Sequence, residues 1–198
     1  MKNIPCFLIG LSLGSILAGC ASKPSHFYSL DSTVTKAGAA PVDCAVLVGP
    51  VFIPAAADRP QFTVVTAPNR VEIDEFNRWN APLSENVARV VSGDLSQLLG
   101  TPRVAVVPMP DIGPAYRVTL RLERFESARM GNQNGEAIVD AIWVVRNPAG
   151  DTVKSGSTDV REPAQGSGYD ALAAAHSRAL AKVSSDIAAA IRAAVEKQ

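Results

Sequence analysis

The sequence predicts an α+β fold in a single domain, with a largely antiparallel sheet and two long helices packed on one face of it. Two segments carry apolar residues at every third or fourth position, the pattern of a helix with one buried face: Leu83–Leu99 and Tyr169–Val195. The other apolar segments are short, mostly alternate apolar with polar residues, and are mostly joined by turns typical of hairpins. This mixture is typical of the α+β class.

Residues 1–19 are predicted to be a signal peptide. Lys2 precedes an apolar run over residues 4–16, which is too short to span a bilayer as a helix. The run ends in four residues that match the bacterial lipobox: Leu17, Ala18, Gly19 and Cys20. Cys20 is therefore the predicted acylation site, and an ordinary secretory signal cut near Ala18 is the alternative. Two or more acyl chains hold a protein stably on a membrane, because each buried CH₂ contributes ~0.8 kcal/mol.

The rest of the 198-residue chain has the length of one domain. Residues 20–25 form a tether, in which residues 21–25 span at most ~17 Å, and residues 26–198 form the domain. Lys+Arg and Asp+Glu both number 19, so no basic excess favours binding to nucleic acid. Once Cys20 is acylated, Cys44 is the only thiol of the mature chain, which excludes an intramolecular disulfide.

The first half of the domain reads as four strands and a helix. Strands are predicted at residues 26–31 and 42–53, and Pro50 marks an edge or a bulge in the second of them. A hairpin over residues 61–66 and 71–76 turns at Pro68 and Asn69, since Pro fixes φ and Asn tolerates a positive φ. Trp79 follows, where sheet gives way to the helix Leu83–Leu99, and Gly100 ends that helix.

The second half reads as four strands followed by the last helix. A short strand at residues 103–108 precedes a strand at residues 116–126, whose alternation places Phe125 on the solvent face. Further strands are predicted at residues 137–147 and 152–161, and the polar composition of the last one indicates an edge. The face that the helices cover is apolar, and the other face is polar enough for water or a partner.

The chain offers little for catalysis or metal binding. His176 lies on the apolar stripe of the last helix and is predicted to be a core histidine, and His26 belongs to the start of the first strand. Neither has a further ligand at the right spacing, so we predict no metal and no cofactor. Gly166, Gly168 and Ala171 fit a dinucleotide fingerprint, but no strand follows the helix to complete the βαβ unit. No Ser/His/Asp set can be nominated.

Arg59 and Arg78 are the strongest candidates for a binding role. They flank the hairpin beside Pro60 and Trp79, and arginine with tryptophan is the composition of an interface hot spot. The alternative is internal: Arg78 pairs with a nearby carboxylate and Trp79 fixes the helix to the sheet.

The same stretch carries a family resemblance. The matching residues are Pro54, Asp58, Arg59, Pro60, Gln61, Asn69, Arg78, Trp79, Pro82 and Leu83. This pattern resembles the PqiC/YmbA-type auxiliary lipoproteins of MCE (mammalian cell entry) transport systems, with further matches at residues 27–31 and 48–51. Residues 55–57 depart from it, because they are alanines where the family often has a large apolar or aromatic residue.

The resemblance implies a non-enzymatic subunit of an MCE/ABC-type lipid transport system. Such a subunit is anchored by N-terminal acyl chains to the periplasmic face of the outer membrane, docks the periplasmic MCE protein, forms a homo-oligomer and supports envelope integrity. Ala21 and Ser22 fit this localisation, since inner-membrane retention usually relies on Asp after the acylated cysteine. Six of the matching residues would bind the partner or define the fold: Arg59, Pro60, Arg78, Trp79, Pro82 and Leu83. An assembly lipoprotein of another envelope complex and a periplasmic hydrolase are the alternatives.

Overall fold

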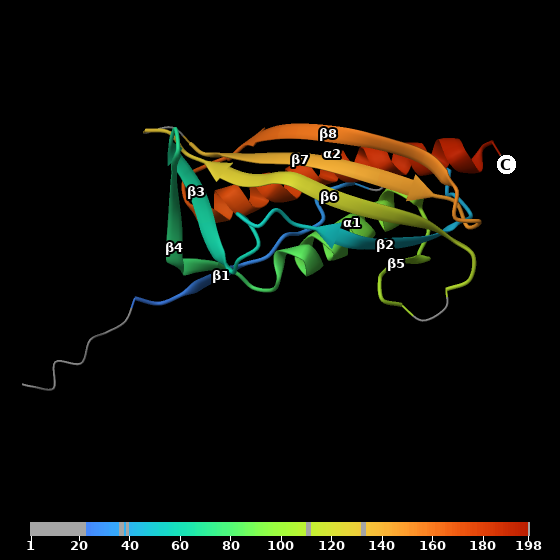
Figure 1. Cartoon of the computed structure of the whole chain (residues 1–198), viewed down its shortest axis with the longest axis horizontal. Coiled ribbons are helices and arrows are strands. Elements are labelled where there is room, and N and C mark those ends of the chain that lie inside the picture. The colour runs from blue at the N-terminus through green and yellow to red at the C-terminus, as the bar shows by residue number, and fades with distance from the viewer. Residues whose placement is uncertain (1–22, 36–37, 39, 110–111, 132–133, 198) are drawn as a thin grey trace, which may run out of the picture.

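One curled, mixed sheet of eight strands and two helices make up the protein (Figure 1). The computed structural model describes residues 23–35, 38, 40–109, 112–131 and 134–197, so the predicted signal peptide and Cys20 lie outside the described residues. The elements in chain order are β1 His26–Tyr28, β2 Ala45–Phe52, β3 Gln61–Ala67, β4 Arg70–Trp79, α1 Leu83–Leu99, β5 Val104–Val106, β6 Ala115–Ala128, β7 Glu136–Arg146, β8 Thr152–Pro163 and α2 Tyr169–Val195. The predicted α+β class and the bounds of both helices are confirmed.

Strand β6 is the centre of the sheet. It pairs with β7 along one side in antiparallel fashion, and with β2 and then β3 along the other side in parallel. The antiparallel pairs β3–β4, β6–β7 and β7–β8 are hairpins, and they contain the longest ladders. The parallel pairs join segments that are distant in sequence, including β1 with β4 and β2 with β5. Among the strands of the described residues, β8 pairs only with β7, which confirms its predicted edge position.

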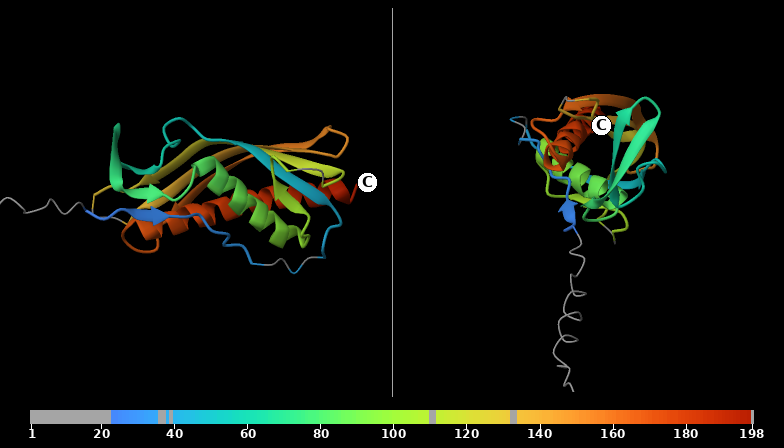
Figure 2. Two further views of the ribbon diagram at one scale, coloured as in Figure 1. Left: turned by 90° about the horizontal axis from the view of Figure 1, so that it is seen from below. Right: turned by 90° about the vertical axis from the view of Figure 1, so that its left-hand side faces the viewer.

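Both helices cover the same face of the sheet, and the core lies between them and the strands (Figure 2). The predicted apolar stripes point into this core. The buried positions of the stripes are Leu83, Val87, Val90, Val91, Leu95 and Leu99 in α1, and Leu172, His176, Leu180, Val183, Ile187 and Ile191 in α2. Burial of these stripes, rather than helix propensity, provides most of the stability of such helices.

Two irregularities shift strand residues from one face to the other. The β2–β6 register shifts between Val48 and Val51, at the predicted position of Pro50. A second shift lies in the β6–β7 ladder between Leu122 and Arg124. The predicted solvent position of Phe125 was wrong, because this bulge adds a residue and turns the Phe125 ring into the core, where it is 3% exposed.

Two glycine-to-alanine changes are expected to affect stability in opposite directions. A Cβ at Gly156 would lie 2.6 Å from Cζ2 of the buried Trp143, so Gly156→Ala should destabilise by ~1–3 kcal/mol through overpacking. A Cβ at Gly93, inside α1, would meet only Ser32 Cβ at 3.9 Å, so Gly93→Ala should stabilise by up to ~1 kcal/mol. Urea unfolding of both variants tests this, and equal effects would contradict the account of Gly156.

Candidate functional site

An aromatic cluster joins the hairpin end of the sheet to α2. We define it as six rings from five elements: Tyr28, Phe62, Trp79, Phe125, Tyr169 and His176. Phe62 stacks on Trp79 with ring centroids 4.2 Å apart, and Phe125 stacks on His176 at 4.1 Å. Trp79 also contacts Phe125 and His176 edge-on, each at 6.0 Å. This geometry makes the cluster the junction at which β1, β3, β4, β6 and α2 meet.

Trp79 and Leu83 lie inside the protein, and Arg78 makes contacts within its own strand. The Trp79 side chain is 6% exposed, and its backbone N–H donates to the Pro60 carbonyl at 2.7 Å. Arg78 Nε donates to the Glu75 carbonyl at 2.9 Å, and its Nη2 lies 3.3 Å from Glu75 Oε2. The pairing of Arg78 with a nearby carboxylate and the burial of Trp79 agree with the internal alternative for these two residues.

Pro82, Leu83 and Arg59, which were also predicted as site residues, lie in three different environments. Pro82 precedes α1 and its carbonyl accepts from Asn86 N at 3.0 Å, while Leu83 is 2% exposed. Arg59 is half-buried, and its Nε is buried without a hydrogen-bond partner among the described residues. Arg59 therefore does not join the Arg78–Glu75 pair, and whether any of these residues binds a partner stays a prediction.

Asp74 and Tyr169 fasten the hairpin to the first turn of α2. The Tyr169 hydroxyl donates to Asp74 Oδ2 at 2.9 Å. Burial and this bond to a carboxylate raise the pKa of Tyr169 to about 12. Burial opposes ionisation of Asp74, but hydrogen bonds from Phe76 N, Asn77 and Tyr169 outweigh it and hold the pKa of Asp74 below its usual value. Asp74 is therefore a structural acceptor rather than a free acid.

His176 of the aromatic cluster also contacts a serine, and the sequence did not reveal this serine–histidine pair. Ser127 Oγ and His176 Nε2 are 2.9 Å apart, a distance that a nucleophile and its base would have. Three features argue against catalysis. Both residues are at most 2% exposed, the adjoining cavity measures only about 10 Å³, and His176 Nδ1 has no partner among the described residues. Complete burial lowers the pKa of His176 to about 3, so the imidazole is a weak base.

Acid is expected to destabilise the fold through His176. The pKa of His176 is about 3 in the folded protein and 6.5 in the unfolded chain. Its contribution to the free energy of unfolding is therefore present above pH 6.5 and is lost as the pH falls towards 3. By linkage this amounts to about 2 kcal/mol between pH 7.5 and pH 5. Urea unfolding at both pH values checks the loss. His176→Gln, which cannot titrate, should lose that much less stability than the parent, and equal losses would contradict the assignment.

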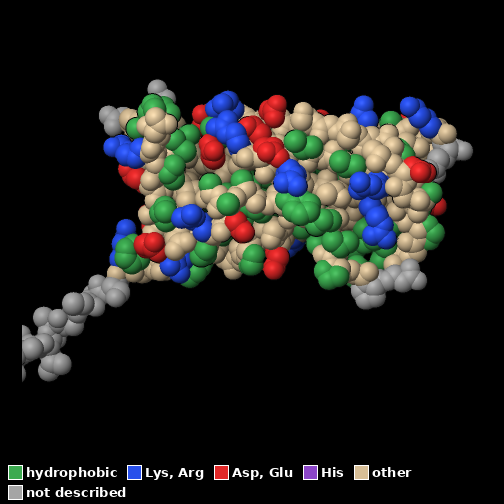
Figure 3. Space-filling model, in the orientation of Figure 1, with side chains coloured by type: hydrophobic (Ala, Val, Ile, Leu, Met, Phe, Trp, Pro, Cys, Tyr) green, Lys and Arg blue, Asp and Glu red, His purple; other side chains and the backbone are tan. Residues whose placement is uncertain are grey.

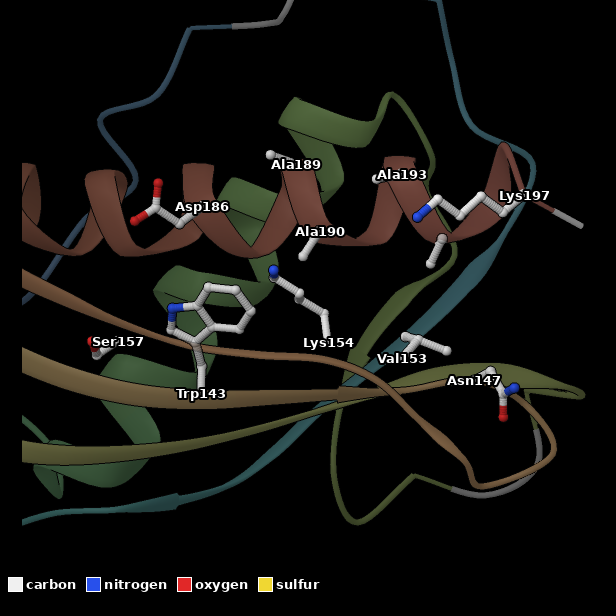
Figure 4. A pocket seen from close by; sticks show the side chains of 11 residues that line it. Trp143, Asn147, Val153, Lys154, Ser157, Asp186, Ala189, Ala190, Ala193 and Lys197 are labelled. Carbon is white, nitrogen blue, oxygen red and sulfur yellow. The ribbon is translucent and has the colours of Figure 1, made fainter.

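A groove of about 770 Å³ runs along the C-terminal half of α2 (Figure 4). It lies between α2 and strands β7 and β8, and we call it the α2 groove. Four alanines line its α2 side: Ala189, Ala190, Ala193 and Ala194. Trp143 and Val153 line the sheet side, and Lys154 and Lys197 extend into it from opposite walls. Small residues along an exposed helix allow another chain to approach closely.

A chain of hydrogen bonds fixes one wall of the α2 groove. Trp143 Nε1 donates to Thr158 Oγ1 at 3.1 Å, and that hydroxyl donates to Asp186 Oδ2 at 2.6 Å. Gly156 leaves room for the indole, as described above. The alanines of α2 can be read from the sequence. The sequence pattern cannot show that β8 lies far enough from the helix to leave a groove.

Two further features bear on membranes and metals. No helix among the described residues has the length and apolar character needed to cross a membrane. Within the same residues, no three His, Cys, Asp or Glu side chains gather closely enough to hold a metal ion.

Comparisons with known proteins identify the family. A model of the ABC-type transport auxiliary lipoprotein component matches residues 28–188. A DUF330 protein from Xanthomonas campestris shares the fold, with a TM-score of 0.70 and 19% identity over 86% of this chain and 99% of that one. An uncharacterized protein of known crystal structure has a TM-score of 0.68 and 18% identity over 85% and 99% of the two chains. No curated protein matches. With the match spanning most of its length, the chain belongs to the family of ABC-type transport auxiliary lipoprotein components.

Proposed function

We propose that this protein is the outer-membrane lipoprotein subunit of an MCE-type lipid transport system. In this proposal acyl chains on Cys20 hold it on the periplasmic face of the outer membrane, where it docks the periplasmic MCE subunit and supports envelope integrity. The observation that carries the proposal is the family match over residues 28–188, together with the Arg-Trp-x-x-Pro-Leu pattern at residues 78–83. The energy for lipid movement would come from the ABC ATPase of the system.

The positions of the chain ends support a bridging role. The described chain begins beside β1, and α2 ends at the opposite end of the long axis (Figure 1). An anchor at Cys20 would therefore leave the α2 groove directed away from the membrane. The proposal assigns docking of the MCE subunit to this groove, because alanines allow close approach and Val153, Lys154 and Asp186 offer apolar and charged contacts. The subunit would act as a homo-oligomer, so that several copies surround one periplasmic partner.

The test is capture of the MCE protein encoded beside this gene by the tagged, acylated protein. Ala193→Glu places a charge in the α2 groove and is expected to abolish capture. Ala174→Glu is the matched control, since Ala174 is also an exposed alanine of α2 but lies outside the groove. Deletion of the gene should sensitise the envelope to detergent. A protein that captures no MCE protein and whose loss leaves permeability unchanged would leave the assembly-lipoprotein alternative.

A further inference from the structure

Exposed apolar side chains gather at the end of the molecule from which the tether leaves. Eight large hydrophobic side chains are exposed in the described part of the chain, and four of them belong to β1 and β4. They are Phe27, Val71, Ile73 and Phe76, with exposed fractions of 64%, 56%, 47% and 36%. We call them the end patch. Figure 3 shows hydrophobic side chains interspersed with basic and acidic ones at this end.

Strand geometry turns Phe27 and Ile73 outwards from their strands, while Val71 also borders β6 across a small hollow. Residues next to one another in a strand point to opposite faces. Tyr28 contacts the buried Phe62, so Phe27 faces outwards. Asp74 reaches Tyr169 on α2, so Ile73 faces away from α2. In Figure 2, right, the β3–β4 hairpin crosses this end of the molecule.

The length of the tether limits what can cover the end patch. Lys23 is the first described residue, and its Nζ lies 5.3 Å from the centroid of the Phe76 ring. Cys20 precedes Lys23 by three residues, which span at most roughly 11 Å when fully extended. An acylated Cys20 therefore brings the bilayer surface close to Phe76. A folded partner has little space between this end and the membrane.

The charges around the end patch nearly cancel. Arg70 lies 4.0 Å from Glu72, and Arg78 lies 3.3 Å from Glu75, so each arginine of β4 has a carboxylate beside it. Lys23 adds a cation that a lipid phosphate can approach. Binding at a bilayer surface scales with buried apolar area plus attraction to anionic lipid. The composition of the patch makes the apolar contribution the larger one.

We infer that the end patch inserts at the boundary between the headgroups and the acyl chains of the bilayer that holds Cys20, so that the domain stands upright on the membrane. This inference rests on the acyl anchoring assigned under the proposed function. It gives the exposed rings of β1 and β4 an apolar environment. It also fixes the distance of the α2 groove from the membrane, because the anchor and the patch together hold the long axis in one direction.

The test uses the mature acylated protein in vesicles of phosphatidylethanolamine and phosphatidylglycerol. A bimane label is attached to Ile73→Cys, and Ile142→Cys on β7 is the matched control, with a parent exposure of 45% against 47%. Cys44 is buried and Cys20 would be acylated, so the label reaches the introduced thiol. Nitroxide-labelled lipid should remove most of the fluorescence at position 73 and leave position 142 unchanged.

Three other outcomes would overturn the inference or its basis. Equal quenching at both positions would contradict upright insertion. A label at position 73 that is shielded from aqueous iodide but not quenched by nitroxide lipid would show that a protein covers the patch, and disulfide cross-linking between two copies at position 73 would identify it as a second copy. If neither labelled protein floats with the vesicles, the anchoring at Cys20 fails instead.

Discussion

Replacing Trp79 by alanine is expected to lower the free energy of unfolding by ~3–5 kcal/mol, the usual cost of removing a large buried ring. The indole is 6% exposed and stacks on Phe62 at 4.2 Å. It also contacts Phe125 and His176. Removing it would leave a cavity at the junction of β3, β4, β6 and α2. Urea unfolding at neutral pH measures the loss.

Two comparisons make the Trp79 result specific. Trp79→Phe keeps an aromatic ring in the stack and should cost less than Trp79→Ala. Ile142→Ala, at an exposed position, should change stability by no more than about 0.5 kcal/mol. A stable Trp79→Ala protein that no longer captures the MCE subunit would instead favour the interface interpretation of Arg78 and Trp79.

Replacing Cys20 by serine is expected to abolish processing by lipoprotein signal peptidase and the attachment of the mature protein to the membrane. A serine oxygen cannot form the thioether to which the diacylglycerol is linked. Without the acyl chains the protein loses the ~0.8 kcal/mol that each buried CH₂ contributes. Immunoblots of fractionated envelopes should show uncleaved precursor and no outer-membrane pool.

Cys44→Ala is the matched control for Cys20→Ser, because it removes the buried thiol just before β2 without affecting the lipobox. It should be processed normally and remain in the outer-membrane fraction. If the Cys20→Ser protein is still cleaved and still fractionates with the outer membrane, Cys20 is not the anchor.

The local elements could be predicted because each depends on neighbours in sequence. The 3.6-residue periodicity defines both faces of α1 and α2, and Gly100 ends α1 with a φ of 68°. Asn69 has the positive φ of 63° that its turn requires. The parallel pairing of β6 with β2 and β3 has no such local signal, since it joins strands separated by a helix and two or three further strands.

The candidate site was predicted only in part, for the same reason. The position of Trp79 between sheet and helix indicates a buried ring, and the structure places it there. The Ser127–His176 pair depends on the bulge that turns Phe125 inwards, and no local pattern reveals a one-residue bulge inside a regular alternation. The α2 groove depends on the distance between β8 and α2, which tertiary packing sets.

Photo-cross-linking inside cells is the most direct test of the claim that this lipoprotein joins the outer membrane to an MCE subunit. A photoreactive phenylalanine replaces Ala193 in the α2 groove of the acylated protein, and Ala174 carries it in the control. We expect irradiation to link the MCE subunit to the lipoprotein in the outer-membrane fraction from position 193 and not from position 174. Recovery of no MCE protein from position 193, or equal recovery from both positions, would contradict docking at this groove.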